Sequence, residues 1–259
     1  MLTGNWAGVD GGGVHGGCLN NCTLTGNSAG ASGGGVDTDH SYGGALVLKN
    51  CILYFNTAPV GANHTSHSSS TMDYCCTTPM PIRGVGNTTL DPQLASASHL
   101  SLNSPCRGAG SADYVSGVDI DGEAWANPPS IGCDEYHAGA VAGPLRVSIL
   151  ASYTNVAVGF AVELAALIEG PTTASVWDFG GGAVLSNRPY ASHAWATPGD
   201  YVVGLRAYNE TYPDDVSATL TIYAVPPPVH CCPRERQSVA ALHVLGHRRH
   251  EHSGGGRCN

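Results

Sequence analysis

The sequence predicts an all-β protein with two structural regions, and three observations support this. Charged residues make up only 12% of the 259 residues, whereas long helices need many Glu, Lys and Arg residues on their exposed face. Fourteen of the 35 glycines fall within the first 44 residues, where short apolar runs recur at fixed spacings. After residue 143, apolar and polar residues alternate, as in strands with one buried face.

The N-terminal region repeats itself. Gly11–Val14 recurs as Gly33–Val36 at a spacing of 22, and Leu19–Leu24 recurs as Leu48–Leu53 at a spacing of 29. A weaker third unit includes Met72–Cys76. Units of this length cannot bury their own hydrophobic face, but stacked units can, each adding parallel strands about 4.8 Å from the last. We therefore expect equivalent residues to lie over one another.

Stacking in this register predicts roles for two pairs of residues. Asn21 lies over Asn50, and their side-chain amides are expected to share hydrogen bonds at a corner. Cys22 lies over Cys51, either as stacked interior thiols or as a disulfide between coils. Glycines are expected at corners, where positive φ or close backbone contact excludes a Cβ atom. The extra seven residues of the second unit fit within Asp37–Gly43, an expected loop.

These blocks resemble the right-handed parallel β-helix repeat proteins found among bacterial secreted and surface polypeptides. The resemblance covers about residues 1–137 and includes five further segments: Asn50–Asn56, Asp91–Pro92, Ser104–Gly110, Asp119–Gly122 and Ile131–Tyr136. It implies that the chain holds the C-terminal part of a solenoid that closes near Tyr136. Some relatives act on pectin-like polysaccharides, and many are adhesive. Near the closing end, Cys106 and Cys133 are candidates for a disulfide.

A different pattern follows residues 138–143, which we interpret as a linker. Five alternating apolar residues from Val156 to Leu164 predict one strand, in preference to a helix over Ala161–Ile168. The same alternation occurs in Tyr201–Ala207 and Ala218–Ala224. Turn sequences rich in Gly, Pro and Asp separate these runs. About seven short strands in some eighty residues predict an immunoglobulin-like β-sandwich over residues 144–225.

This second region resembles the PKD domain (polycystic kidney disease repeat). Its motif residues are Trp177, Asp178, Phe179 and Gly180, then His193 and Trp195, then Pro198, Gly199 and Tyr201. The family usually has Trp-Asp-Phe-Gly-Asp-Gly, whereas this chain has three consecutive glycines, and Trp195 stands where Tyr is commoner. Trp177 and Phe179 share one strand face and are expected to fill the space between the sheets. Asp178 points the other way and is expected to cap the glycine turn.

Residues 226–259 differ from the rest and are predicted to be a disordered or frameshifted tail. They hold five of the eleven basic residues and five of the twelve histidines. A metal site is not favoured, because no standard Cys-x-x-Cys-to-His spacing joins His243, His247, His250 and His252 with Cys231, Cys232 and Cys258. A frameshift would explain this tail. If suitable codons for His243–Ser253 are translated one nucleotide later, the resulting segment is like those that open the next β-helix in tandem proteins of this group. We expect further domains upstream and downstream in a longer secreted chain.

The candidate metal ligands outside the tail are Asp119, Asp121 and Glu123. Their alternating carboxylates suit calcium, but the complete twelve-residue calcium loop pattern is absent, so a solvated turn is the favoured interpretation. No other cofactor is predicted. Cleavage of polysaccharides needs clustered carboxylates, and the clear repeats offer only Asp10, Asp37 and Asp39, with Lys49 as the single lysine and His15 and His40 isolated. No catalytic constellation is therefore predicted.

Three functions agree with these features. The favoured one is a non-catalytic extracellular or cell-surface segment that mediates adhesion or contacts polysaccharide or surface proteins. The others are a fragment of a polysaccharide-degrading lyase or hydrolase whose active coils lie upstream, and a structural spacer. The net charge of −9 argues against a nucleic-acid partner. The sequence has no run of eighteen apolar residues, so no membrane span is predicted.

Overall fold

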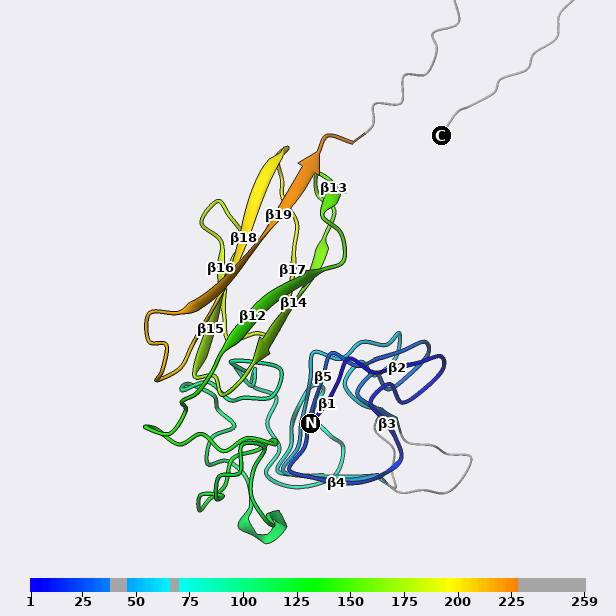
Figure 1. Ribbon diagram of the computed structural model, residues 1–259. Coiled ribbons are helices and arrows are strands. Elements are labelled where there is room, and N and C mark those ends of the chain that lie inside the picture. Colours follow the sequence, from blue (N-terminus) through cyan, green and yellow to red (C-terminus); the bar gives the residue numbers. More distant parts are fainter. Residues whose placement is uncertain (38–45, 66–69, 228–259) are drawn as a thin grey trace, which may run out of the picture. The chain divides into compact units, whose positions relative to one another are not determined.

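The computed structural model describes residues 1–37, 46–65 and 70–227, which are almost entirely strands and loops (Figure 1). These ranges contain 19 strands and one short 3-10 helix, η1 (Ala112–Tyr114), so the all-β class is confirmed. Met1–Pro227 form one compact unit. None of the helical structure in the described ranges is long and apolar enough to cross a membrane. The tail from residue 228, and most of the Asp37–Gly43 insertion, lie outside the described residues.

Residues 1–77 are built from parallel strands. One sheet has the order β1 (Leu2–Thr3), β5 (Thr23–Thr25), β9 (Ile52–Tyr54) and β11 (Cys76–Thr77). A second has the order β4 (Gly17–Asn20), β8 (Leu46–Lys49) and β10 (Thr71–Asp73). Two smaller parallel pairs join β2 (Trp6–Ala7) to β6 (Ser28–Ala29) and β3 (Val14–His15) to β7 (Val36–Asp37). Figure 1 shows these segments, in blue and cyan, lying over one another.

The register of these sheets follows the spacings in the sequence. Leu2 pairs with Leu24 across 22 residues, and Leu19 pairs with Leu48 across 29. In the third unit, Met72 pairs with Leu48 in turn. Leu24, Leu48 and Met72 are all buried in one apolar cluster. The recurring apolar positions of the repeat blocks thus form a shared interior.

Asn21 and Asn50 occupy equivalent corners, directly after the paired residues Asn20 and Lys49, but the expected hydrogen bond between their amides is not formed. Asn50 instead exchanges two 2.9 Å hydrogen bonds with the backbone of Ser111, and Asn21 Nδ2 has no partner among the described residues. Both asparagines have positive φ, 47° and 50°. Asparagine adopts this conformation more readily than most residues, which explains its recurrence here.

A ladder of asparagine amides does exist, at a different corner. Asn27 Oδ1 accepts hydrogen bonds from the backbone N–H and side-chain amide of Asn5, at 3.0 and 2.9 Å. Asn56 Oδ1 accepts the same two bonds from Asn27, and Asn63 Oδ1 accepts them from Asn56. Asn27, Asn56 and Asn63 are buried. We call Asn5, Asn27, Asn56 and Asn63 the asparagine ladder.

The cysteines of the repeats and of the closing segment are free thiols. Cys22 and Cys51 lie at equivalent positions, and the hydrogen bond that the Cys22 thiol donates to Cys51, together with burial, raises the pKa of the Cys22 thiol. Of the two alternatives for this pair, the structure has the stacked thiols. Cys106 and Cys133 are both buried and unbridged, so the candidate disulfide near the closing end is not formed.

Residues 146–225 form two facing sheets, as predicted for an immunoglobulin-like sandwich (Figure 1). The three-stranded sheet has the order β12 (Arg146–Ala151), β14 (Val162–Glu169) and β17 (Tyr190–His193). The other has the order β13 (Asn155–Ala157), β19 (Val216–Val225), β18 (Gly199–Tyr208), β15 (Ala174–Asp178) and β16 (Val184–Ser186). Pairing is antiparallel, except that β13 runs parallel to β19.

The predicted single strand from Val156 to Leu164 is wrong, because the chain changes sheet within this run. β13 pairs with β19 in one sheet and β14 pairs with β12 and β17 in the other. At the crossover, Gly159 has a φ of 81° and donates its N–H to Trp195 O at 2.9 Å. Phe160 is consequently 48% exposed. The alternation survives because both strands send alternate residues into the same core. The preference for strand over helix at Ala161–Ile168 is confirmed by β14.

Replacement of Asn56 by alanine tests the asparagine ladder. Asn56→Ala removes the acceptor for two Asn27 groups and the donor to Leu24 O and Tyr54 O, leaving buried polar groups without partners. We expect a loss of about 2–3 kcal/mol in the free energy of unfolding, measured by urea denaturation followed by circular dichroism. The exposed Asn20→Ala is the control, with an expected change below about 0.5 kcal/mol. Equal effects of the two variants would contradict a stabilising ladder.

Candidate functional site

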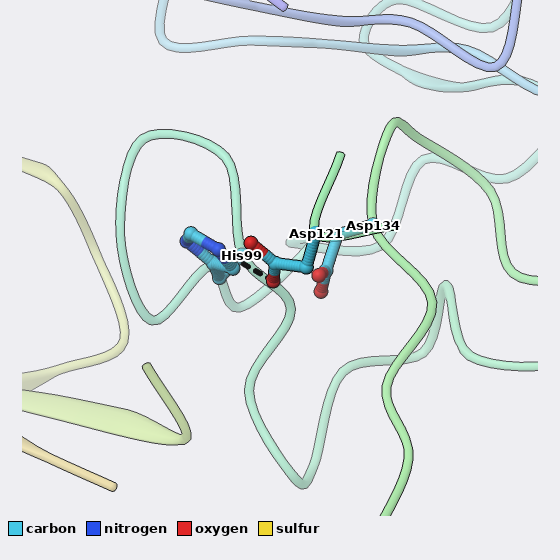
Figure 2. A group of neighbouring side chains, drawn as sticks. All are labelled: His99, Asp121 and Asp134. Atoms are coloured by element: carbon cyan, nitrogen blue, oxygen red, sulfur yellow. Dashed lines mark hydrogen bonds and ion pairs between the residues drawn. The ribbon is translucent and has the colours of Figure 1, made fainter. Parts of the chain in front are cut away.

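The segment between Asp91 and Tyr136 brings together a group of potential metal ligands. Among the described residues of this segment, regular structure is limited to η1 and two isolated bridges, Leu94↔Leu100 and Val118↔Ala124. Its loops place His99, Asp121 and Asp134 side by side (Figure 2). One ligand atom from each lies within 4.8 Å of the others. We call these three residues the His–Asp–Asp group.

His99 is held from both sides of its ring. Its Nε2 atom lies 3.1 Å from Asp121 Oδ2, and its Nδ1 atom lies 2.8 Å from Ser96 Oγ and 3.1 Å from Ser98 Oγ. Burial acts to lower the pKa of His99, but the hydrogen bond to Asp121 and the charges of nearby carboxylates outweigh it. The pKa of His99 is therefore raised above its ordinary value, and the site favours a positive charge at this point.

Asp134 is buried with few hydrogen-bond donors. Its Oδ2 accepts the backbone N–H of Leu100 at 2.8 Å, and its other carboxylate oxygen has no hydrogen-bond partner among the described residues. Burial raises the pKa of Asp134 to about 6, against the opposing effects of His99 and the Leu100 N–H. The side chain is only 5% exposed, so water compensates its charge poorly.

Of the three predicted calcium ligands, only Asp121 joins this group. Asp119 is buried, and its carboxylate accepts the backbone N–H groups of Asp121, Glu123 and Glu135 at 3.0, 2.7 and 2.9 Å. Asp119 therefore closes a turn, and the central residues of this turn, Ile120, Asp121 and Gly122, are exposed to solvent. Glu123 borders the same cavity as the group, and its carboxylate lies outside the set of three.

Sequence reasoning missed His99 and Asp134. Asp121 is 22 residues from His99 and 13 from Asp134, and no repeat or motif connects the three positions. Ile131–Tyr136 was noted only as a closing segment typical of a family. The group arises from loop packing, for which the sequence carries no periodic signal.

A second feature lies on the sandwich, where two aromatic rings are exposed together. Tyr153, in the β12–β13 connection, and Phe160, in the β13–β14 connection, are 59% and 48% exposed. Their ring centroids are 5.7 Å apart with an interplanar angle of 79°. This edge-to-face geometry is a favourable one for aromatic rings. The pair presents apolar ring surface to solvent at one position.

A family model of the PKD domain matches residues 147–222. These residues form a PKD domain. Solved structures with similarity include the PKD domain of an M14-like peptidase from a Thermoplasmatales archaeon, with 20% identity, a TM-score of 0.27, and coverage of 31% of this chain and 93% of that one. The PKD domain of the human VPS10 domain-containing receptor SorCS2 has 27% identity, a TM-score of 0.28, and coverage of 32% and 74%.

A structure described as carbohydrate-binding modules of the β-sandwich superfamily has 22% identity, a TM-score of 0.29 and coverage of 32% of this chain. This chain spans 35% of that structure's length. No curated protein matches the chain.

The motif residues of the PKD domain form its core and one of its turns. Trp177 and Phe179 are buried and stack at 6.1 Å, and Phe179 stacks on His193 at 4.5 Å. Trp195 donates its Nε1–H to Phe179 O at 3.0 Å. The Tyr201 hydroxyl contacts Thr197 just before the turn at Pro198 and Gly199, where β18 begins.

Asp178 serves the turn as predicted. Its Oδ1 accepts the backbone N–H of Gly180 at 2.9 Å. Gly180, Gly181 and Gly182 all have positive φ, 76°, 73° and 92°. The three consecutive glycines therefore suit a turn that bends repeatedly in the left-handed region.

Substitution of Asp119 separates turn closure from ligand binding. In Asp119→Asn one oxygen becomes an amide donor, so at least one of the three backbone N–H groups loses its acceptor. We expect a loss of about 1–3 kcal/mol in the free energy of unfolding, measured by urea denaturation. Glu123→Gln, whose side chain makes no hydrogen bond among the described residues, is the matched control and should change stability by less than about 0.5 kcal/mol. A neutral Asp119→Asn would contradict the turn-closing role.

Proposed function

We propose that this chain is a non-catalytic extracellular or cell-surface segment that contacts extracellular polysaccharide through its PKD domain. In this proposal residues 1–137 are the C-terminal part of a right-handed parallel β-helix that serves as a stalk. Residues 138–143 are the linker, 144–225 the binding module, and 226–259 a tail. PKD domains are typically extracellular, which supports the proposed location.

The parallel strands of residues 1–77 support the stalk. Their registers repeat at the spacings of the sequence blocks, as successive coils of a solenoid require. From Asn5 to Asn27 and from Asn27 to Asn56, the asparagine ladder connects equivalent corners of successive coils in the same direction, and Asn63, seven residues after Asn56, ends it. A continuous stack of this kind suits the display of an attached module.

The exposed aromatic pair is the observation that carries the binding role. Tyr153 and Phe160 lie outside the sandwich core, so packing of the PKD domain does not account for two large exposed rings. Aromatic rings at a protein surface are typical of contact sites. The C–H faces of sugar rings stack on aromatic rings, so a polysaccharide is the partner whose chemistry suits this surface.

The carboxylates of the repeats support a non-catalytic role because they are used by the fold. Asp10 Oδ1 accepts hydrogen bonds from Ser32 N and Oγ at 3.0 and 2.7 Å. Asp37 Oδ1 accepts from Ser32 Oγ and Thr65 Oγ1. Lys49, the single lysine, lies 4.2 Å from the ring centroid of Tyr114. Asp39 and His40 lie outside the described residues.

Binding of the full chain to immobilised polysaccharides, including polygalacturonan, xylan, cellulose and β-glucan, tests the proposal. We expect saturable binding to at least one polymer, weakened at least about tenfold by the double variant Tyr153→Ala/Phe160→Ala, because each exposed ring contributes stacking area. Tyr212→Ala, which removes another exposed tyrosine of the PKD domain, is the control and should bind normally.

The two alternative functions give different results in the same assay. Release of new reducing ends or unsaturated sugars from the polymer would indicate a polysaccharide-degrading enzyme. Retention on no polymer would indicate a spacer. In a parallel assay on immobilised cell-surface proteins, retention there and on no polymer would move the partner to that class. Any of these three results would overturn the proposed polysaccharide contact.

A further inference from the structure

We propose that His99, Asp121 and Asp134 bind one divalent transition-metal ion, with Zn²⁺ as the preferred ion, and that this ion fastens the loops between residues 94 and 136. The site is separate from the aromatic pair of the PKD domain and does not depend on the proposed polysaccharide contact.

The geometry of the group suits a metal ion. Zn²⁺ binds histidine nitrogen and carboxylate oxygen at about 2.0–2.2 Å, which places neighbouring ligand atoms roughly 3.5 Å apart. His99 Nε2 and Asp121 Oδ2 are already 3.1 Å apart, and all three ligand atoms lie within 4.8 Å of one another. The Asp121 side chain is 29% exposed, so it can rotate to close the remaining distance.

Asp134 gives an independent reason to expect a cation. Its side chain is buried, yet one carboxylate oxygen has no hydrogen-bond partner among the described residues. Buried carboxylates are normally paired or bound to metals, because an uncompensated charge in the interior is costly. Asp134 borders a cavity of about 170 Å³ together with His99, Asp121 and Glu123. The Asp134 side chain therefore adjoins space that is large enough for an ion and a water molecule.

The neighbours of the group hold its buried members in place. The Leu100 N–H fixes Asp134, and Ser96 and Ser98 lie at Nδ1 of His99. On metal binding the ring proton resides on Nδ1, where Ser98 Oγ accepts it, and the Nε2 lone pair is directed to the ion. Hydrogen bonds of this kind to the second ring nitrogen orient most metal-binding histidines.

The donor set selects the type of ion. Calcium takes six to eight oxygen ligands, and the group offers two carboxylates and one imidazole. An imidazole with carboxylates suits Zn²⁺, which completes four ligands with one water molecule in the cavity. The three residues come from loops that no sheet connects. The backbone hydrogen bond from Ile120 N–H to Cys133 O, at 2.9 Å, joins the loops of Asp121 and Asp134, and the ion would add a cross-link from both to the loop of His99.

Zinc titration of the full, chelator-stripped chain tests the proposal, with bound Zn²⁺ counted by a competing colorimetric chelator and the unfolding midpoint Tm measured in parallel. A hundredfold excess over the dissociation constant should raise Tm by roughly 5–10 °C. His99→Gln and Asp134→Asn should each bind one ion fewer at equal free Zn²⁺ and lose this rise. Asp134→Asn keeps an acceptor for the Leu100 N–H, so its fold should survive.

The matched control is His15→Gln. His15 forms a pair with Asp37 at 3.4 Å but belongs to no group of three ligands among the described residues, so its variant should bind as many ions as the original chain. Ions held by the histidines and cysteines after residue 228 remain in every variant and cancel in the comparison. Ser98→Ala, which removes the acceptor for the Nδ1 proton of His99, should weaken binding by about 10–100-fold.

Two outcomes would overturn the proposal. One is an equal number of bound ions and an equal rise in Tm for the original chain, His99→Gln and Asp134→Asn. The other is a rise in Tm with Ca²⁺ and none with Zn²⁺, which would assign the group to a hard oxygen-binding ion instead.

Discussion

The parallel region depends on how each repeat unit satisfies its buried polar groups where the chain turns between strands. Asn56 accepts the backbone N–H and side-chain amide of Asn27, and donates its own amide to Leu24 O and Tyr54 O. This packing also explains the glycines opposite. A Cβ atom at Gly35 would lie 2.9 Å from Asn56 Nδ2 and 2.3 Å from Asn63 O, and one at Gly13 would lie 3.1 Å from Asn27 Nδ2. The recurring glycines therefore leave the space that the recurring asparagine side chains need in order to form the ladder.

Residues 78–145, all of which the structure describes, form no strand, and side chains share with the backbone the pairing of backbone groups there. Asp119 accepts three backbone N–H groups, Glu135 Oε2 accepts that of Ser130 at 2.7 Å, and Asp134 accepts that of Leu100. This use of carboxylates places several negative charges in a small volume. Asp134 has the fewest donors of the three, and it is the one that meets His99. The His–Asp–Asp group is thus a consequence of how loops without a β-ladder satisfy their backbone.

The sequence predicted the fold well where a periodic pattern reports local geometry. Repeat spacing predicted the pairing of Leu19 with Leu48, because similar blocks favour similar environments. The assignment of the amide ladder to Asn21 and Asn50 was wrong. Asparagine recurs both where the backbone needs a positive φ and where side-chain amides pair, so its recurrence alone does not tell which of the two applies. The choice needed the register of the corners, which only the neighbouring repeat units determine. Alternation likewise could not distinguish one strand from two strands facing a common core. The ligand group left no pattern at all, because its members meet through loop packing.

In the PKD domain the departures from the usual motif have a physical explanation. Gly181 stands where the family usually has an acidic residue, and its φ of 73° lies in the left-handed region that Gly, Asp and Asn adopt most easily. A Cβ atom there would meet nothing within 4 Å, so neither packing nor a contact requires a side chain. Asp178 caps Gly180 without help from position 181. The left-handed backbone conformation at position 181 restricts it to a few residue types, such as Gly, Asp and Asn. The acidic residue usual in the family satisfies this restriction, and so does the glycine of this chain.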